Sequence, residues 1–310
     1  MVRASLTKCA RCGADATSWC AGCVDAPEYQ PGDAASVVYC GRDCQKDHWP
    51  DHKARCRAMR QRHKLLQAAK ILKRAFLTYR EVVFDLDLTK IEFRDGILYL
   101  HQKPTVRRKR CIFPSHLVNN PEHREAALAN NQCTTAIALL GRLTRKLLSG
   151  VASTIEMMDI NIGKPLVPTK LIPNPSGLDS RDCPHTVLRV RRADETWILD
   201  TTGCQYGFRD VLIPYQKYLA DKECRIVNEP TTYDATETKD LDFFSTLPFM
   251  NRTRCQREDR ELERRARLHF AVFVDTRVSK DMLDGSAAEI KAASDGFADE
   301  LKSHMVDFTK

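Results

Sequence analysis

The chain has 310 residues, which is enough for two or three domains of ordinary size. With 43% hydrophobic and 29% charged residues, 13 Gly and 14 Pro, it is expected to be soluble and globular rather than collagen-like, mucin-like or wholly disordered. No apolar run could span a membrane, and residues 1–5 lack the apolar core of a secretory signal. An odd count of 13 Cys without such a signal favours metal ligands or a reactive thiol over a disulfide framework. We therefore expect a cytoplasmic protein, with the nucleus as an alternative location.

Seven of the 13 cysteines fall within the first 56 residues and form, with one histidine, four closely spaced pairs. The pairs are Cys9/Cys12, Cys20/Cys23, Cys40/Cys44 and His52/Cys56. Eight such ligands make two tetrahedral zinc sites in which the protein fills every position, so both are expected to be structural. So short a segment cannot bury a sufficient core, and the metal must contribute folding energy. We prefer His52 over His48 as a ligand because His52 and Cys56 are one helical turn apart.

This spacing, with Tyr39 before Cys40 and the His48-Trp49 pair before the last ligands, resembles the MYND zinc finger. The resemblance implies interleaved ligands, with Cys9, Cys12, Cys40 and Cys44 on one zinc and Cys20, Cys23, His52 and Cys56 on the other. It also implies a docking module for protein partners, typically short proline-containing peptides. The long insert between Cys23 and Cys40 departs from the family pattern, and we interpret it as an enlarged loop.

Ten Lys or Arg residues and no Asp or Glu lie between Lys53 and Arg80, so the rest of the chain sums to −2. Apolar residues at helical spacing predict one long amphipathic helix: Met59, Leu65, Leu66, Ala69, Leu72, Phe76, Tyr79 and Val83. Its basic face, residues 53–80, could bind tRNA or another polyanion. Alternatively it is solvated or paired with acidic residues elsewhere, such as Asp234, Glu237, Asp240 and Asp242. We leave these alternatives open.

A hairpin is predicted over residues 91–100, where Asp95-Gly96 suits a type I′ turn. The basic run that follows, residues 107–110, could be a nuclear localisation signal, but a solvated surface explains it better. Farther along, the spacing of apolar residues predicts a buried helix from Cys133 to Leu148, ending at Gly150. At its first turn, unpaired backbone N–H groups and the helix dipole would lower the pKa of the Cys133 thiol.

Residues 186–191 and 196–200 are predicted to form an antiparallel hairpin that turns near residues 192 and 193. That register sets position 185 opposite position 200, so His185 and Asp200 are expected side by side. A carboxylate orienting an imidazole beside a nucleophile is the arrangement of a catalytic triad.

The order of Gln132-Cys133 at a helix start, His185 opening a strand and Asp200 ending the next one resembles the transglutaminase-like branch of the papain fold. The resemblance implies that Cys133 is the nucleophile, His185 the general base and acid, and Asp200 the orienting carboxylate. The backbone N–H of Cys133 would then hold the oxyanion together with a side chain, for which Gln132 is a candidate. Thr134 departs from the family, in which an aromatic residue often follows the cysteine.

Other cysteines and helices complete the prediction. Cys183 is an alternative reactive thiol but lies outside any helix start, whereas Cys111, Cys204, Cys224 and Cys255 are interpreted as buried or incidental. Further helices are expected over residues 215–222, over residues 251–270 with paired charges, and as one or two helices over residues 287–306.

The sequence therefore predicts an α+β protein. Residues 1–58 would form a two-zinc MYND finger, residues 59–110 a basic linker helix and hairpin, and residues 111–310 a transglutaminase-like domain with C-terminal helices. The predicted function is acyl transfer from an amide, ester or thioester, ending in hydrolysis, transamidation or amide-bond formation. The acyl donor could be carried on a nucleic acid such as an aminoacyl-tRNA. The alternative is a non-catalytic adaptor whose MYND finger binds protein partners and whose papain-like domain is degenerate.

Overall fold

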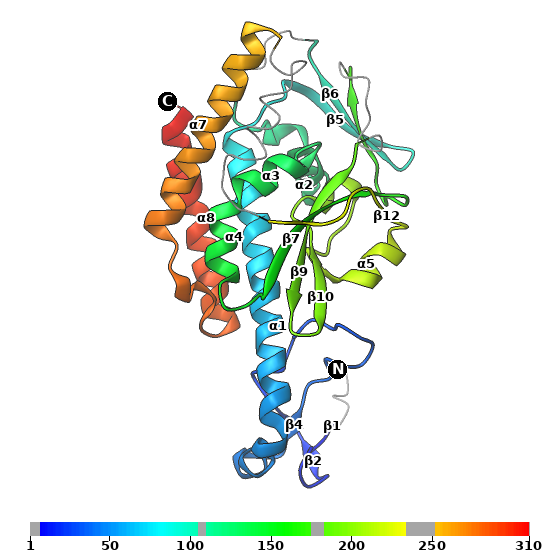
Figure 1. Ribbon diagram of the computed structural model, residues 1–310, viewed down its shortest axis with the longest axis vertical. Coiled ribbons are helices and arrows are strands. Elements are labelled where there is room, and N and C mark those ends of the chain that lie inside the picture. The colour runs from blue at the N-terminus through cyan, green and yellow to red at the C-terminus, as the bar shows by residue number, and fades with distance from the viewer. Residues whose placement is uncertain (1–6, 105–109, 175–182, 234–251, 310) are drawn as a thin grey trace. The chain divides into compact units, whose positions relative to one another are not determined.

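The computed structural model describes residues 7–104, 110–174, 183–233 and 252–309 (Figure 1). It divides into two compact units, Met1–Gln67 and Ala68–Lys310. The boundary lies within helix α1 (Arg42–Val82), so the residues predicted to form a linker divide between the two units. The helix also begins earlier than the apolar pattern suggested, and Pro50 lies inside it.

The first unit contains little regular structure besides the start of α1. Two short antiparallel pairs are formed by β1 (Thr7–Lys8) with β2 (Asp15–Ala16) and by β3 (Ser18–Trp19) with β4 (Val38–Tyr39). Its core has ten buried residues, four of which are cysteines: Cys9, Ala16, Cys20, Cys23, Ala26, Val37, Val38, Tyr39, Cys56 and Met59. So small an apolar core cannot stabilise the unit without additional bonds.

The second unit contains a small three-stranded sheet in the order β5 (Leu88–Arg94), β6 (Ile97–Gln102) and β8 (Thr169–Ile172). Asp95 and Gly96 both have positive φ, 53° and 75°, which confirms the predicted turn between β5 and β6. The helical turn η1 (Ser115–Leu117) and helix α2 (Pro121–Ala129) follow, and Asn120 caps α2. Buried residues of α2, including Ala127 and Leu128, join Leu98 and Leu100 in one apolar cluster.

The larger sheet is antiparallel, in the order β11 (Leu212–Pro214), β10 (Glu195–Leu199), β9 (His185–Arg192), β7 (Thr154–Asn161) and β12 (Arg225–Ile226). A further strand, β13 (Thr231–Thr232), also pairs with β7. Helix α5 (Tyr215–Asp221) covers one face, where Tyr218 packs in a cluster with Val187 and Ile198. The helical turn η2 (Gly203–Tyr206) follows β10.

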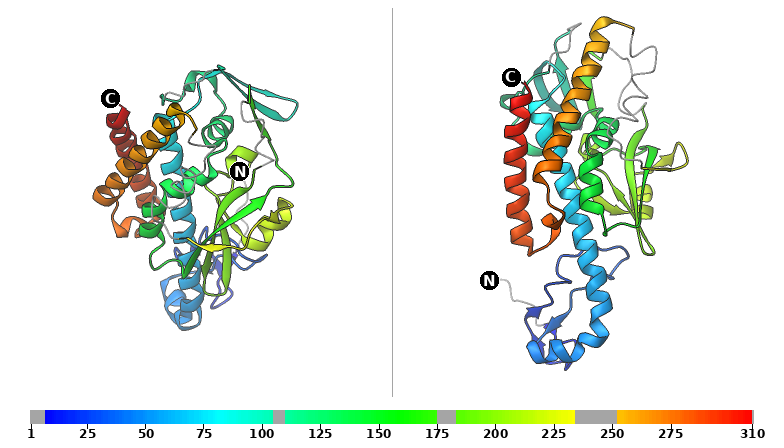
Figure 2. Two further views of the ribbon diagram at one scale, coloured as in Figure 1. Left: turned by 45° about the horizontal axis from the view of Figure 1, so that its top comes forward. Right: turned by 60° about the vertical axis from the view of Figure 1, so that its left-hand side comes forward.

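Helices α3 (Cys133–Leu139) and α4 (Gly141–Leu148) lie on the other side of this sheet from α5, with α7 (Arg254–Arg277) and α8 (Ala287–Thr309) beyond them (Figures 1 and 2). The turn η4 (Lys280–Leu283) joins α7 to α8. The α+β architecture, the long helix and the C-terminal helices are thus as predicted. The single helix predicted from Cys133 to Leu148 is instead two helices that break at Leu140, where Gly141 has a low helix propensity.

The register of the β9–β10 hairpin also differs from the prediction. Leu188 pairs with Leu199 and Arg192 with Glu195, and the turn falls at Ala193 and Asp194. Continuing this register sets Asp200 opposite Val187, two residues from the predicted partner. Because side chains alternate between faces, His185 still lies on the same face as Val187 and Asp200, on a diagonal within reach of Asp200.

The basic residues of α1 do not form one uniform surface. Several of the ten contact carboxylates of the described residues, among them Arg62 with Asp33, Lys73 with Glu125, Arg74 with Asp295 and Arg80 with Asp85. The acidic stretch expected as a partner, residues 234–242, lies outside the described residues, as do residues 107–109 of the basic run. Among the helices that the structure describes, none is both long and apolar enough to cross a membrane.

Candidate functional sites

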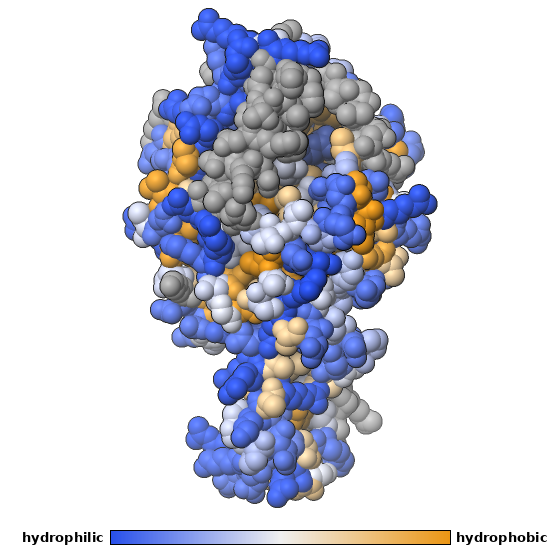
Figure 3. Space-filling model, in the orientation of Figure 1, coloured by the Kyte–Doolittle hydropathy of each residue, from blue (hydrophilic) through white to orange (hydrophobic). Residues whose placement is uncertain are grey.

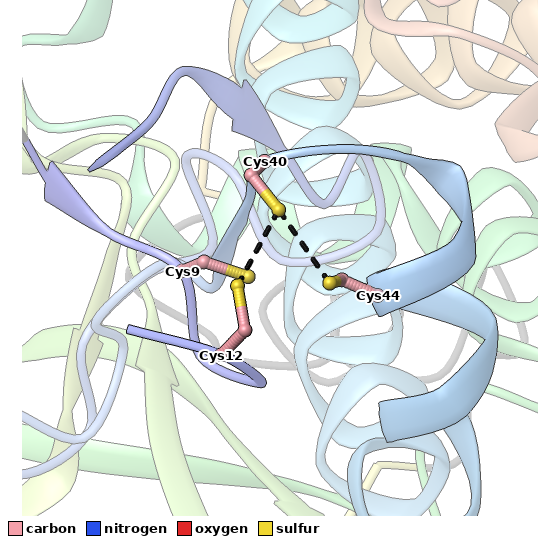
Figure 4. Close-up of side chains that lie close together, drawn as sticks. All are labelled: Cys9, Cys12, Cys40 and Cys44. Carbon is pink, nitrogen blue, oxygen red and sulfur yellow. Dashed lines mark hydrogen bonds between the residues drawn. The ribbon is translucent and has the colours of Figure 1, made fainter. Parts of the chain in front are cut away.

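Four cysteines of the first unit converge around one point. In Figure 4 the sulfur atoms of Cys9, Cys12, Cys40 and Cys44 face one another, the first two from the loop after β1 and Cys44 from the first turn of α1. The Sγ atom of Cys40 lies 3.6 Å from the Sγ atom of Cys12 and 3.5 Å from that of Cys44. These distances are far longer than the roughly 2.05 Å of a disulfide. They are close to the spacing of about 3.8 Å that tetrahedral zinc with Zn–S bonds of about 2.3 Å imposes.

The second cluster has the same geometry and is fully buried. The Nε2 atom of His52 lies 3.3 Å from the Sγ atoms of both Cys20 and Cys23, and Cys20 Sγ is 3.7 Å from Cys56 Sγ. The four ligand atoms of each cluster all lie within 4.8 Å of one another. The donor sets, Cys₄ and Cys₃His, fit zinc, and the interleaved pairing is the one that the resemblance to the MYND finger implied. These are therefore two structural zinc sites.

His48 is not a ligand. Its Nδ1 atom lies 3.0 Å from the Tyr39 hydroxyl, and its ring stacks on that of His52 at 5.8 Å. The helical spacing that favoured His52 over His48 is thus confirmed. His48 and Tyr39 instead support the imidazole that binds the metal.

The insert between Cys23 and Cys40 is attached to α1 by an ion pair and by hydrogen bonds from Arg55 to the carbonyl groups of Asp33 and Ala35. The two terminal nitrogens of Arg62 donate to the two carboxylate oxygens of Asp33 at 2.9 and 2.8 Å. Burial would raise the pKa of Asp33, but the hydrogen bonds from Arg62 and from the backbone of Gln30 and Tyr29 hold it below its ordinary value. A planar guanidinium that binds a carboxylate with two bonds fixes both position and orientation. The enlarged loop is therefore anchored.

A second group of functional side chains meets in the larger unit. Cys133 is the first residue of α3, and His185 is the first residue of β9. Asp200 directly follows β10, and its Oδ2 atom lies 3.0 Å from Nε2 of His185. His185 is fully buried and Asp200 is 4% exposed, whereas Cys133 is partly exposed. The structure therefore brings together the three residues selected from the sequence.

The pKa values of this group are coupled. Burial alone would lower the pKa of His185, but the charge of Asp200 and its close contact with the imidazole raise that pKa to about 10. Burial would raise the pKa of the Cys133 thiol, but a hydrogen bond to His185 and the charge of His185 lower it below the ordinary thiol value. The contact between His185 and Asp200 is close without being well aligned as a hydrogen bond, so charge dominates it. These directions favour a thiolate beside an imidazolium.

Asp200 is held on three sides. Its Oδ2 atom accepts a hydrogen bond of 2.7 Å from the buried Tyr218 hydroxyl, and its Oδ1 atom accepts one of 3.1 Å from the Thr202 amide. A Cβ atom on Gly203 would lie only 2.4 Å from Oδ2. Because these contacts favour the ionised form, the pKa of Asp200 stays below its ordinary value despite burial.

Gln132, the predicted oxyanion donor, is directed toward another group. Its Nε2 atom donates to Oδ2 of Asp85 at 3.1 Å, and Asp85 also contacts Arg80 and Arg110. One proton of the amide is thus engaged, while the second is available for another acceptor. Cys183, the alternative thiol, is exposed and lies before β9 rather than at a helix start.

Gln205 is a neighbour of the triad that the sequence analysis did not select. It is 1% exposed, and its Nε2 atom lies 3.4 Å from Nδ1 of His185. The only sequence signal was its position, five residues after Asp200, and no spacing rule connects that position with His185. Tyr206, next in the chain, packs edge-on against the same imidazole, with ring centroids 5.0 Å apart.

Two closed zinc centres on interleaved ligands define a small zinc-binding module at the start of the chain. Residues 9–56 match the family model of the MYND finger, so this segment is a MYND finger. MYND fingers typically mediate protein–protein interactions. Neither the comparison with curated proteins nor that with solved structures finds a significant match to the chain.

Proposed function

We propose that this protein is an enzyme that transfers acyl groups through Cys133, with its MYND finger serving as a docking module for a protein partner. The observation that carries the proposal is the meeting of the Cys133 thiol, at the start of α3, with a buried imidazole and a buried carboxylate. This arrangement is expected for a papain-like or transglutaminase-like site, in which the base is oriented by a third group.

The proposed reaction has two stages. The Cys133 thiolate attacks the acyl carbonyl, and the imidazolium of His185 gives its proton to the leaving amine, alcohol or thiol, which yields a thioester on Cys133. Water or an amine then attacks the thioester, and its proton passes to His185 as the thiolate leaves. Asp200 stabilises the imidazolium throughout. Hydrolysis, transamidation and amide formation differ only in the acceptor of the second stage.

In this proposal the backbone N–H of Cys133 stabilises the oxyanion, which is supported by its place in the first turn of α3, where helix amides lack partners within the helix. Gln132 is the candidate for the second donor, with Asp85 orienting its amide. Binding of an acyl donor carried on a nucleic acid would need free positive charge on α1. Because Arg62, Lys73, Arg74 and Arg80 contact carboxylates, that idea gains no support and stays a prediction.

Thiol reactivity tests the proposal. With zinc retained, iodoacetamide at about pH 6 should alkylate Cys133 at least about tenfold faster than Cys255, an exposed cysteine of the same chain. His185→Gln should abolish the difference, and Cys133→Ser should remove the adduct. Activated acyl esters should also leave a mass increment on Cys133 that hydroxylamine removes. Equal alkylation rates at Cys133 and Cys255, or the absence of an acyl adduct, would contradict the proposal that the protein is an enzyme.

The second candidate function is a protein-binding adaptor without catalysis. It is favoured by the finger itself and by two exposed tryptophans, Trp19 on β3 and Trp49 on α1, with 51% and 42% of their surface accessible. Exposed aromatic side chains are common at protein interfaces. On the face drawn in Figure 3 the surface of the finger is mostly hydrophilic. A surface without a large apolar patch is expected for a module that stays folded when its partner is not bound. The same alkylation experiment separates the two candidates.

A further inference from the structure

Gln205 contacts both the turn that precedes the proposed nucleophile and the proposed base. Its Oε1 atom accepts a 3.0 Å hydrogen bond from the backbone N–H of Asn131, two residues before Cys133. Its Nε2 atom lies 3.4 Å from Nδ1 of His185, the ring nitrogen that does not face Asp200. The amide thus connects the turn before α3 with the first residue of β9.

The orientation of this amide follows from its partners. A backbone N–H can only donate, so the atom of Gln205 that meets Asn131 must be the oxygen. The NH₂ group is then the one that faces His185. An N–H donor directed at Nδ1 forms a hydrogen bond only when Nδ1 carries no proton. Gln205 therefore favours the imidazole in which the single proton is on Nε2, facing Asp200.

Asn131 gives this contact a second role. Its φ of 55° lies in the left-handed region, which asparagine tolerates better than most residues. The turn at Asn131 fixes the direction in which the chain enters α3 at Cys133. The hydrogen bond to Gln205 satisfies the backbone N–H of Asn131 in that turn. With 1% of its surface exposed, Gln205 has almost no access to water that could replace either contact.

We infer that Gln205 is a positioning residue that destabilises the imidazolium of His185 and so eases the transfer of its proton to the leaving group. The inference rests on the proposed function, because it assigns a role in the same reaction. Asp200 by itself would hold the proton too firmly on an imidazole whose pKa is raised to about 10. A donor that bonds only to the deprotonated Nδ1 opposes that effect.

Other ionisable groups act on the same pair from the elements packed around it. They are Cys133 on α3, Cys204 and Tyr206 on η2, Tyr218 on α5, Lys222 after α5 and Lys73 on α1. Lys73 and Lys222 act through the charge of Asp200. Among these contacts, the Gln205 amide is the neutral one made to Nδ1 of His185.

Two substitutions at Gln205 should move the pH profile of Cys133 alkylation in opposite directions. In Gln205→Met the N–H donor is lost, so the imidazolium is more stable, and its charge keeps the Cys133 thiolate ionised at lower pH than in the wild type. In Gln205→Glu the carboxylate repels the thiolate, so the inflection moves to higher pH by about one unit and the rate near pH 6 falls about tenfold. Gln216→Glu, on an exposed position of α5, is the matched charge control and should change nothing.

A purely structural role for Gln205 would shift both variants in the same direction, and that result would overturn the inference. If instead wild-type Cys133 is no more reactive than Cys255, the proposed function itself has failed. A measurement on the unaltered chain covers the case in which both variants unfold. The side-chain amide protons of Gln205 should shift in NMR spectra with the same pH midpoint as the ring of His185, and an unresponsive amide would refute the contact.

Discussion

At the scale of single residues, Gly203 shows how closely the carboxylate of Asp200 is packed. Any larger residue would bring its Cβ to 2.4 Å from Oδ2, a distance that forces the carboxylate or the backbone to move. Asp200 is also bonded to Tyr218 and Thr202, so it cannot move without breaking a hydrogen bond. The glycine is therefore required by the position of the acid.

Gly203→Ala should destabilise the larger unit by about 1–3 kcal/mol, the usual cost of overpacking a filled interior. It should also slow the alkylation of Cys133 near pH 6, because a displaced Asp200 no longer stabilises the imidazolium. Urea unfolding and the alkylation rate measure the two effects. The control is Gly296→Ala in α8, where a Cβ would meet nothing within 4 Å. There we expect about 0.5–1 kcal/mol of stabilisation, and unchanged alkylation. A tolerated Gly203→Ala would show that Asp200 is not constrained.

The candidate site residues could be selected from the sequence because each stands at a recognisable place. Cys133 begins an apolar helical pattern, and His185 and Asp200 flank a hairpin. Gln205 could not be selected, since its contacts depend on how the turn after β10 folds back onto His185. Gln132 was selected for its place in the chain, but only the fold directs its amide to Asp85.

At the scale of elements, the insert of the finger depends on a contact that lies 29 residues away in the chain. The Arg62 side chain is 7% exposed and that of Asp33 is 25% exposed, so water screens their pair only in part. The insert itself has no strand or helix between Cys23 and β4. Its conformation therefore relies on such side-chain contacts.

Arg62→Lys should loosen the insert without removing a charge, because lysine cannot bind both carboxylate oxygens in a fixed plane. We expect faster hydrogen exchange over residues 24–37 and a loss of stability of about 1–3 kcal/mol. Arg57→Lys, on an exposed position of the same helix, is the matched control and should have little effect. Unchanged exchange in the insert of the Arg62→Lys variant would contradict the anchoring role.

Two element-scale predictions were wrong in detail for physical reasons. Strand periodicity identifies the faces of β9 and β10 but does not fix the turn, and a turn moved along by one residue shifts the pairing by two. The apolar spacing after Cys133 continues without interruption, so it predicted one helix. The helix breaks at Leu140 because the next residue, Gly141, has a low helix propensity. Neither error moved His185 to the other face of the sheet.

At the scale of the whole molecule, the charge of the sequence has to be recounted once the zinc sites are included. A Cys₄ centre carries a formal charge of −2 and a Cys₃His centre −1, so the two centres together lower the formal charge of +8 by three. Part of the basic helix therefore compensates its own finger. Arg60 illustrates this, because its positive charge opposes the burial and the neighbouring Cys20 that raise the pKa of the Cys56 thiol.

The two units should respond differently to zinc removal. Their cores consist of separate clusters, and four of the ten residues buried in the core of the finger are zinc ligands. A strong chelator at neutral pH should abolish amide protection over residues 9–56 while the strands β7, β9 and β10 stay protected. Hydrogen exchange by mass spectrometry measures both. Simultaneous loss of protection in the sheet would contradict independent units.

The same experiment should release the two ions in order. Cys12 and Cys40 of the first site are exposed, whereas all four ligands of the second are buried. Native mass spectrometry should therefore detect a one-zinc form during chelation, in which Cys20, Cys23 and Cys56 stay protected from alkylation. Release of both ions together would show that burial does not control their exchange.

The sequence by itself determined the closely spaced pairs of zinc ligands and the mixed helix and sheet composition of this protein. These features follow from local spacing, because metal geometry and apolar periodicity act over a few residues. How the pairs divide between the two ions was implied by the resemblance to the MYND finger and not by spacing. The tertiary structure alone decided which carboxylates neutralise the basic helix, where the hairpin turns and what surrounds His185. Those outcomes depend on contacts between segments distant in the chain, whose packing no local pattern encodes.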